Sequence, residues 1–420
     1  MRSNYKKLGQ FIQGVSVKNK GLNVELLLGV SITKRFIPSI ANTVGTDMST
    51  YKIVKRNQFA YGSVTSRNGE KISVALLTED ECLVSSSYTV FEVVDTLLLE
   101  PEYLMMWFRR SEFDRYARFM SHGTVREQFS WEDMCDVELP VPSIEKQREI
   151  VREYNVVNDR IALNEQLTQK LEDTAQAIYK QWFVDFEFPI SKEYAESISK
   201  PELEGKPYKS SGGKMEYCEV IEKDIPLSWQ RYNLENLVER VCVGFVGTLH
   251  SSYCEEANGV RLLRTTDLTE QGMSYIDNKF VLPAFHQKNK KSQLKYGDIL
   301  VARHGSNGMP VIYDRLDEAN CLNVIILKPC LNRMTPKLIQ QFIKSESATE
   351  QIRGSLRGSV QSVLNTKIVA ALNLSYFKED SLNSVDTSPF QKIHQYIEKV
   401  RNENVHLRKL RTLLLTKMSK

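Results

Sequence analysis

Several marks of catalytic proteins are absent from this sequence of 420 residues. No GxGxxG or GxxxxGK[ST] motif occurs, which excludes the usual nucleotide-binding loops, and no Asn-Pro-Pro-aromatic motif of an amino-methyltransferase occurs. The seven cysteines form no CxxC pair and have no histidine at ligand spacing, which argues against zinc. The six histidines do not cluster either. We therefore expect no catalytic centre, no metal and no cofactor on this chain.

Long apolar runs and a strong excess of charge are absent as well. No run approaches the roughly 18 residues that cross a bilayer, and no apolar signal core follows residues 1–7. The net charge of +4 permits nucleic-acid binding without requiring it. An odd number of scattered cysteines fits free thiols in a reducing compartment. We expect a cytoplasmic protein with no membrane partner.

An internal repeat is the main feature that the sequence does contain. Tyr61-Gly62 returns as Tyr296-Gly297 and Pro101 returns as Pro336, both at a shift of 235 positions (296 − 61 and 336 − 101). In each copy, short apolar runs between turns precede a helix, expected at 101–119 and 336–352, and a closing strand. A shared register over such a length predicts two similar domains.

A long helix with a heptad pattern follows each copy. Apolar residues recur at steps of four and three, which keeps one stripe of a helix facing a partner. We expect the helices at about 145–182 and 389–418 to pair, although each helix alone covering its own domain is an alternative. The predicted apolar seam consists of Ile150, Tyr154, Val157, Ile161, Leu171, Ile178, Ile393, Ile397, Val400, Leu407 and Leu414; the polar seam residues Asn164, Thr168, Asn404 and Arg411 can fix the register.

Together these patterns predict an α+β fold. It has two similar mixed α/β domains separated by two long helices that pair as an antiparallel coiled coil. The expected bounds are 1–143 for the first domain, 144–183 for its helix, 184–224 for a linker, 225–386 for the second domain and 387–420 for the last helix.

Basic and small polar residues gather in loops at matched places of the two copies. Lys and Arg neutralise phosphates, while Arg and Asn can bond guanine and adenine edges. For any single residue, a solvated turn is the simpler interpretation, but the matched set favours DNA contact. The predicted DNA-binding residues are Lys52, Lys55, Arg56, Ser63, Thr65, Ser66, Arg67, Asn68, Ser121, His122, Thr124 and Arg126 in the first copy, and Lys288, Lys290, Lys291, Arg303, His304, Ser306, Asn307, Arg353, Arg357, Ser359 and Gln361 in the second.

Four stretches carry a family resemblance: 139–147 (LPVPSIEKQ), 182–189 (WFVDFEFP), 207–213 (PYKSSGG) and 225–229 (IPLSW). With them, the chain resembles the specificity subunit of a Type I restriction–modification system. The resemblance implies two target-recognition domains, each reading half of an asymmetric split DNA site. It implies two modification subunits that carry S-adenosylmethionine, and restriction subunits that use ATP and Mg²⁺.

Two other functions stay open from the residues alone. A self-contained DNA-modifying enzyme is disfavoured by the absent cofactor and metal motifs. A scaffold whose domains bind protein, and not DNA, is distinguished by whether the chain binds duplexes with the salt dependence of phosphate contacts.

Overall fold

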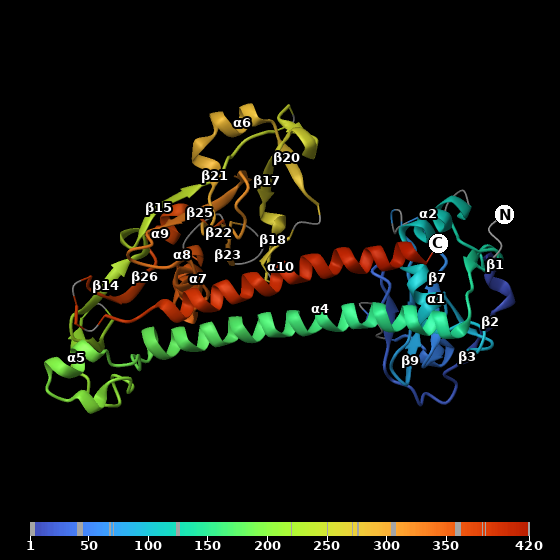
Figure 1. The fold of residues 1–420 in the computed structure, drawn as a ribbon, viewed down its shortest axis with the longest axis horizontal. Coiled ribbons are helices and arrows are strands. Elements are labelled where there is room, and N and C mark those ends of the chain that lie inside the picture. The colour runs from blue at the N-terminus through green and yellow to red at the C-terminus, as the bar shows by residue number, and fades with distance from the viewer. Residues whose placement is uncertain are drawn as a thin grey trace. The chain divides into compact units, whose positions relative to one another are not determined.

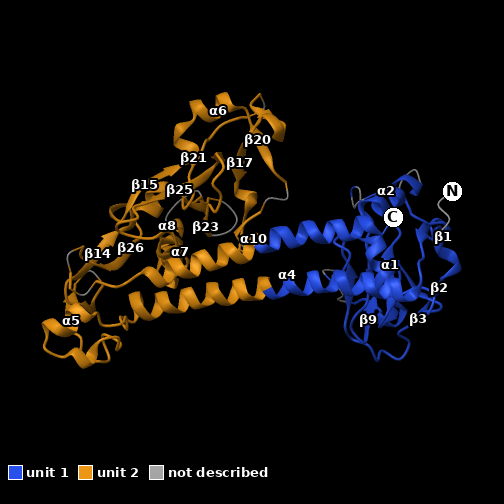
Figure 2. Ribbon diagram, in the orientation of Figure 1, with its two compact units in different colours: residues 1–163, 403–420 blue, residues 164–402 orange. Residues whose placement is uncertain are grey.

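A computed structural model describes the chain apart from residues 1–4, 40–44, 67–68, 70, 123–126, 220, 250, 271, 275–276, 304–307, 358–362, 380, 383 and 419–420. The chain forms two compact units (Figure 2). Unit 1 comprises 1–163 and 403–420, and unit 2 comprises 164–402. Each unit therefore contains one globular domain and part of each long helix.

The domain of unit 1 combines antiparallel sheets with three short helices (Figure 1). Its main sheet has the order β2-β10-β7-β8, and β1 pairs with β11. The strands are β1 (Tyr5–Lys7), β2 (Ile12–Val15), β3 (Val17–Lys18), β4 (Leu28–Val30), β5 (Phe36–Pro38), β6 (Lys52–Lys55), β7 (Gln58–Gly62), β8 (Val74–Leu76), β9 (Glu81–Val84), β10 (Tyr88–Val93) and β11 (Glu138–Pro140). The helices are α1 (Pro101–Phe108), α2 (Ser111–Met120) and α3 (Trp131–Cys135).

Aromatic side chains join this sheet to its helices. Phe59 of β7 stacks on Phe91 of β10 at 4.8 Å, and Phe108 of α1 meets both rings edge-on. The single helix expected over 101–119 is two helices, because Arg110 takes an extended backbone conformation with ψ of 143°. The break lets α1 pack on the sheet while α2 leads into the loop after Met120.

The domain of unit 2 repeats this plan with an insertion. Its main sheet has the order β15-β25-β22-β23, β14 pairs with β26, and a five-stranded sheet β16-β20-β17-β24-β21 stands where unit 1 has the three-stranded sheet β3-β6-β9. The strands are β12 (Met215–Cys218), β13 (Lys223–Pro226), β14 (Trp229–Asn233), β15 (Val238–Val243), β16 (Tyr253–Cys254), β17 (Val260–Arg264), β18 (Leu268–Thr269), β19 (Gly272–Met273), β20 (Lys279–Val281), β21 (Gln293–Leu294), β22 (Ile299–Ala302), β23 (Pro310–Ile312), β24 (Ala319–Leu322), β25 (Val324–Pro329) and β26 (Asn373–Phe377). The helices are α5 (Lys192–Ser197), α6 (Pro283–Lys288), α7 (Pro336–Lys344), α8 (Glu346–Arg357) and α9 (Thr366–Ala370).

The shift of 235 holds for only part of the repeat. It relates α1 to α7 (336 − 101) and β11 to β26 (373 − 138). In the central strands, the pair Phe59–Phe91 corresponds to Ile299–Leu327, so the shift in β7 is 240 (299 − 59). Tyr61 therefore corresponds to Val301, and its expected match with Tyr296 is wrong. The cause is the insertion between β15 and β22, which changes the chain length before the central strand.

The two long helices run antiparallel, as the heptad pattern predicts. They are α4 (Ile144–Tyr179), which ends in a π-helical turn over Lys180–Val184, and α10 (Ser388–Lys417). In unit 1, Arg160 pairs with Glu403 at 2.8 Å and Arg411 donates to Asn158. In unit 2, Glu172 lies 3.7 Å from Arg401, while Trp182 packs on Phe390. In both units, higher numbers on α4 meet lower numbers on α10.

The predicted apolar seam residues are all buried or partly buried. Tyr154, Val157, Ile161, Ile397, Val400 and Leu414 are buried, and Ile150, Leu171, Ile178, Ile393 and Leu407 are partly buried. The polar seam residues Asn164 and Asn404 are buried too, and Nδ2 of Asn404 lies 3.4 Å from the Ile161 carbonyl of α4. A buried polar group at a seam position favours one register over others.

The segment 184–224, expected as a linker, is folded into unit 2. Phe188 stacks between Tyr208 and Trp229 at centroid distances of 4.6 and 5.1 Å. Gly213 closes this packing, because a Cβ there would lie 2.4 Å from the Tyr208 ring. The polar composition of the segment obscures the few aromatic residues that anchor it. Across the described residues, no helix is long and apolar enough to span a membrane.

Candidate nucleic-acid interface

The two predicted contact loops of unit 1 lie side by side. The Phe129 amide donates to the carbonyl of Ser63, just after β7, at 2.8 Å. Val64 forms an isolated bridge with Gln128, which also pairs with His122. The loop after β7 and the loop between α2 and α3 therefore form one surface, which we call the joined loops of unit 1.

Only some side chains of the joined loops face solvent. Thr65 and Ser121 are buried, and their hydroxyls donate to the carbonyls of Glu127 and Ala117. Ser63 is partly buried, while Ser66 and His122 are exposed. Four further predicted residues, Arg67, Asn68, Thr124 and Arg126, lie outside the described residues. The two buried hydroxyls therefore support the loop backbone, and the two exposed residues are available to a ligand.

The three predicted basic residues Lys52, Lys55 and Arg56 lie near opposite ends of β7. Lys52 Nζ donates to the Tyr88 carbonyl at 2.6 Å, and Tyr88 pairs with Gly62 at the end of β7 that leads into the joined loops. Burial and the neighbouring Lys18 lower the pKa of Lys52. Lys55 and Arg56 precede the opposite end of β7, where Arg56 pairs with Asp80 at 2.8 Å. Only Lys52 is thus placed near the joined loops.

Unit 2 joins its own two loops through the same backbone bond. The Leu364 amide donates to the Arg303 carbonyl at 3.2 Å, and these residues correspond to Phe129 and Ser63 (364 − 129 = 235; 303 − 63 = 240). The Arg303 guanidinium donates to the Leu364 carbonyl and, at 2.6 Å, to Oδ1 of Asn323. Arg303 therefore ties the joined loops of unit 2 together.

The remaining predicted residues of unit 2 fall in two places. Arg353 and Arg357 are exposed one turn apart on α8, which leads into the joined loops. Lys288 at the end of α6 is exposed, and so are Lys290 and Lys291 between α6 and β21, a strand of the five-stranded sheet. Five more, His304, Ser306, Asn307, Ser359 and Gln361, lie outside the described residues.

The sequence patterns missed one basic residue of unit 1. Arg118 on α2 forms an ion pair with Glu127, a member of the joined loops. It occupies the position of Arg353 in unit 2 (353 − 118 = 235). The repeat itself was the signal that identifies it, because Arg353 belongs to the predicted set.

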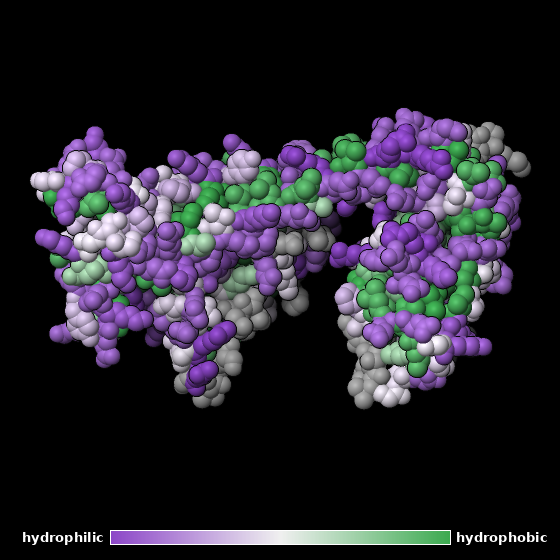
Figure 3. Space-filling view, turned by 90° about the horizontal axis from the view of Figure 1, so that it is seen from below, coloured by the Kyte–Doolittle hydropathy of each residue, from purple (hydrophilic) through white to green (hydrophobic). Residues whose placement is uncertain are grey.

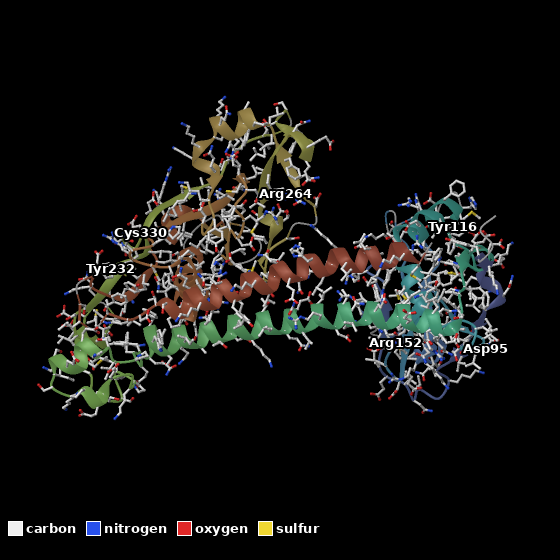
Figure 4. All side chains as sticks on the ribbon, viewed as in Figure 1. Asp95, Tyr116, Arg152, Tyr232, Arg264 and Cys330 are labelled. Carbon is white, nitrogen blue, oxygen red and sulfur yellow. The ribbon has the colours of Figure 1, made fainter. Side chains whose placement is uncertain are left out.

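Other charged side chains serve the fold. Arg264, labelled in Figure 4, extends from β17 and donates to Asp267 at 2.8 Å and to the Asp277 carbonyl at 2.7 Å. The Asp267 carboxylate, and after it that of Asp277, raise the pKa of Arg264. No group of three His, Cys, Asp or Glu residues suited to a metal occurs in the described part of the chain.

Two copies of one mixed α/β domain, each with joined loops and each followed by a long helix, define a duplicated recognition protein. The family model of the Type I restriction modification DNA specificity domain matches residues 6–173. Residues 6–173 thus match the specificity domain of Type I restriction–modification systems, and the chain is similar to their specificity subunits over most of its length.

Individual relatives agree with this placement. The specificity subunit of the Type I restriction enzyme HindI from Haemophilus influenzae is 23% identical over 425 aligned residues, which cover 90% of this chain and 89% of that protein. The MjaIX specificity subunit from Methanocaldococcus jannaschii is 25% identical over 138 residues, or 33% of this chain and 27% of that protein. The crystal structure of the S subunit from M. genitalium shares the fold, with a TM-score of 0.53 and 13% identity over 99% of this chain and 96% of that one.

Proposed function

We propose that this chain binds double-stranded DNA at a split, asymmetric target, with each set of joined loops reading one half. The observation that carries this proposal is the backbone bond that joins equivalent loops in both units, Ser63 to Phe129 and Arg303 to Leu364. Equivalent positions hold different side chains, such as Ser63 and Arg303, and we expect the two half-sites to differ in sequence. Exposed Arg and Lys near the loops neutralise phosphates.

The chain recognises DNA and leaves the chemistry to its partners. Two modification subunits bring S-adenosylmethionine and methylate adenine, and restriction subunits bring ATP and Mg²⁺. Methylation inside a duplex requires the target base to leave the stack, which is work for the modification subunits. All seven cysteines are free thiols, which supports function in the reducing cytoplasm.

The helix pair offers a surface on which modification subunits dock. In unit 1, Val156 and Leu163 on α4 are 68% and 58% exposed, and Leu413 on α10 is 58% exposed. Figure 3 shows apolar side chains along the helices on the face that it draws. Uncovered apolar surface of this kind marks protein-binding sites. Leu163→Glu should therefore block assembly with the modification subunit in size-exclusion chromatography, while Glu165→Gln, on the same helix, should not.

Methylation mapping tests the DNA-reading function. The chain is expressed with its modification subunits in a host without other adenine methylation, and methylated adenines are located genome-wide. We expect one motif with two unlike halves around an unread spacer. A continuous motif, or methylation that persists without this chain, would contradict the proposal.

Duplex binding separates DNA reading from the two other functions. The purified chain should bind its target with an affinity that falls steeply with salt concentration, as expected for several phosphate contacts. Salt-independent behaviour would favour a protein scaffold. Methyl transfer or cleavage by the chain alone would favour a self-contained enzyme.

A further inference from the structure

A buried carboxylate on α4 holds the domain of unit 2 to the long helices. Oε2 of Glu172 lies 2.7 Å from Nζ of Lys337 and 3.3 Å from Nζ of Lys344, both on α7. Its other oxygen lies 3.7 Å from Arg401 of α10. The side chains of Lys337 and Glu172 are 1% and 12% exposed. We call these four residues the Glu172 seat.

The Glu172 carboxylate is charged in the folded protein, while burial lowers the pKa of its partner Lys337 to about 8. Burial alone would raise the pKa of Glu172, but Lys337 and Lys344 outweigh burial and hold this pKa at about 2. A buried ion pair often contributes less to stability than apolar packing of the same volume, yet losing one partner leaves an uncompensated charge. The ion pairs of Glu172 therefore restrict the orientation of α7 more than they add to folding stability. Only an orientation that brings Lys337 and Lys344 to Glu172 avoids an unpaired buried charge.

Two further elements of the same domain meet α10 beside the seat. The Tyr296 hydroxyl donates to Oε2 of Glu398 at 2.7 Å. Gly272 in β19 has φ of +115°, and a Cβ there would lie 3.0 Å from Cζ of Arg401. Three separate elements therefore contact the long helices within unit 2: α7 contacts Glu172 of α4, while β19 and the turn before β22 contact α10. Figure 1 shows α7 beside α10. Contacts from three elements fix an orientation, whereas one contact would allow rotation.

In unit 1, the residue that corresponds to Lys337 is a carboxylate, and it also contacts α4. Lys337 corresponds to Glu102 of α1 (337 − 102 = 235), and Oε2 of Glu102 accepts from Nδ2 of Asn155 on α4 at 2.7 Å. Glu100 also pairs with Arg148 of α4 at 3.2 Å. The domain of unit 1 thus presents Glu102 to α4 where that of unit 2 presents Lys337, whereas Arg109, at the position of Lys344, keeps its positive charge and lies over the Tyr154 ring of α4. A carboxylate in place of Lys337 would face Glu172 directly.

We propose that the Glu172 seat is a positioning element that fixes the orientation of the second recognition domain on α4 and α10, and thereby the spacer length that the protein accepts. The proposal rests on the split-site function proposed above. Both α4 and α10 continue into unit 1. In this proposal, the orientation of the second recognition domain on these helices therefore affects the spacing between the two half-sites. Glu172 contacts no DNA in this proposal and acts through Lys337 and Lys344.

The test measures spacer preference with the chain assembled with its modification subunits. Duplexes carry the mapped half-sites with spacers from two base pairs shorter to two longer than the mapped one, and a further duplex keeps only one half-site. Wild type should prefer the mapped spacer by about tenfold. Glu172→Gln should reduce that preference at least threefold and leave binding to the single half-site within twofold. Glu172→Asp should restore most of the preference, and Asp173→Asn, the exposed neighbouring carboxylate, should leave it unchanged.

Each outcome decides between positioning and simple support of the fold. An unchanged spacer profile in Glu172→Gln would overturn the proposal, and so would equal weakening on every duplex, including the single half-site. If Glu172→Gln does not fold, Lys337→Met removes the charge from the other side with an unbranched apolar chain, and the same loss of preference is expected. A wild type that binds single half-sites but has no preferred spacer would refute the split-site function, and the seat with it.

Discussion

At the scale of single residues, His394 on α10 is a group whose charge changes with pH near the Glu172 seat. Burial, together with Lys337 and Arg401, lowers the pKa of His394 to about 4 from its ordinary 6.5. The unfolded chain therefore binds a proton at higher pH than the folded one. The contribution of His394 to stability is complete above pH 6.5 and is lost as pH falls through 6.5 towards 4.

This shift predicts a pH-dependent difference between wild type and His394→Gln. At pH 4.5 the buried neutral imidazole should cost wild type about 2–3 kcal/mol of unfolding free energy relative to pH 7.5, at about 1.4 kcal/mol per pKa unit. His394→Gln has no titrating group at position 394. Its unfolding free energy should therefore fall by about 2–3 kcal/mol less than that of wild type between pH 7.5 and pH 4.5. Urea unfolding at both pH values measures the difference. Equal losses in the two proteins would show that His394 does not titrate as described.

Among exposed basic residues, Lys290 is expected to contact phosphate. Lys290→Ala should weaken binding to all duplexes by a similar factor and reduce the slope of log K against log salt by about 1, because one phosphate contact is lost. Lys206→Ala, an exposed lysine remote from α6 in sequence, serves as the matched control. A change in sequence preference for Lys290→Ala would instead indicate contact with bases.

Residue types could be predicted for the joined loops, but side-chain directions could not. Ser and Thr in a Gly-containing loop suit phosphate contact, yet Thr65 and Ser121 turn inward to backbone carbonyls. Arg303 likewise bonds Leu364 and Asn323 within the loops. Local sequence does not specify these directions, because they depend on acceptors far along the chain.

At the scale of elements, the heptad seam predicts which helix substitutions destabilise the protein. Ile161 on α4 is 6% exposed and lies in the core of unit 1 with Leu414, whereas Leu163 is 58% exposed. Ile161→Ala should cost about 2–4 kcal/mol through lost burial and a residual cavity. Leu163→Ala should change stability by less than about 0.5 kcal/mol. Thermal and urea unfolding of both variants check this, and a similar cost for the two would contradict the described seam.

The long helices could be predicted because their periodicity is local. Which element of one copy corresponds to which element of the other could be predicted only in part. The long helices follow from heptads within their own sequence, and α1 to β11 keep the shift of 235. The predicted register of β7 failed because the segment between β15 and β22 of unit 2 is longer than the segment between β2 and β7 of unit 1. The anchoring of 184–224 depends on Phe188 meeting Tyr208 and Trp229, contacts that polar composition does not reveal.

At the scale of the whole molecule, the repeat predicts that recognition domains can be exchanged if their seats match. Residues 5–140, from β1 to β11, correspond to residues 229–377, from β14 to β26. A chain carrying the first segment in both places would present Glu102 to Glu172, where the second segment presents Lys337. Arg109 already provides a cation at the position of Lys344 (344 − 109 = 235). The unmodified exchange therefore places two carboxylates in one buried seat.

We expect Glu102→Lys in the second copy to rescue such a chain. Without the substitution, repulsion between two buried carboxylates should weaken docking of the transplanted domain and reduce methylation at least tenfold. With it, genome-wide mapping should show a motif whose second half is replaced by a repeat of the first. Glu112→Lys in the second copy, an equal change of charge on α2, is the control and should not rescue. Rescue by both substitutions would mean that net charge matters and the seat does not, whereas a retained second half-site would show that residues outside 229–377 read it.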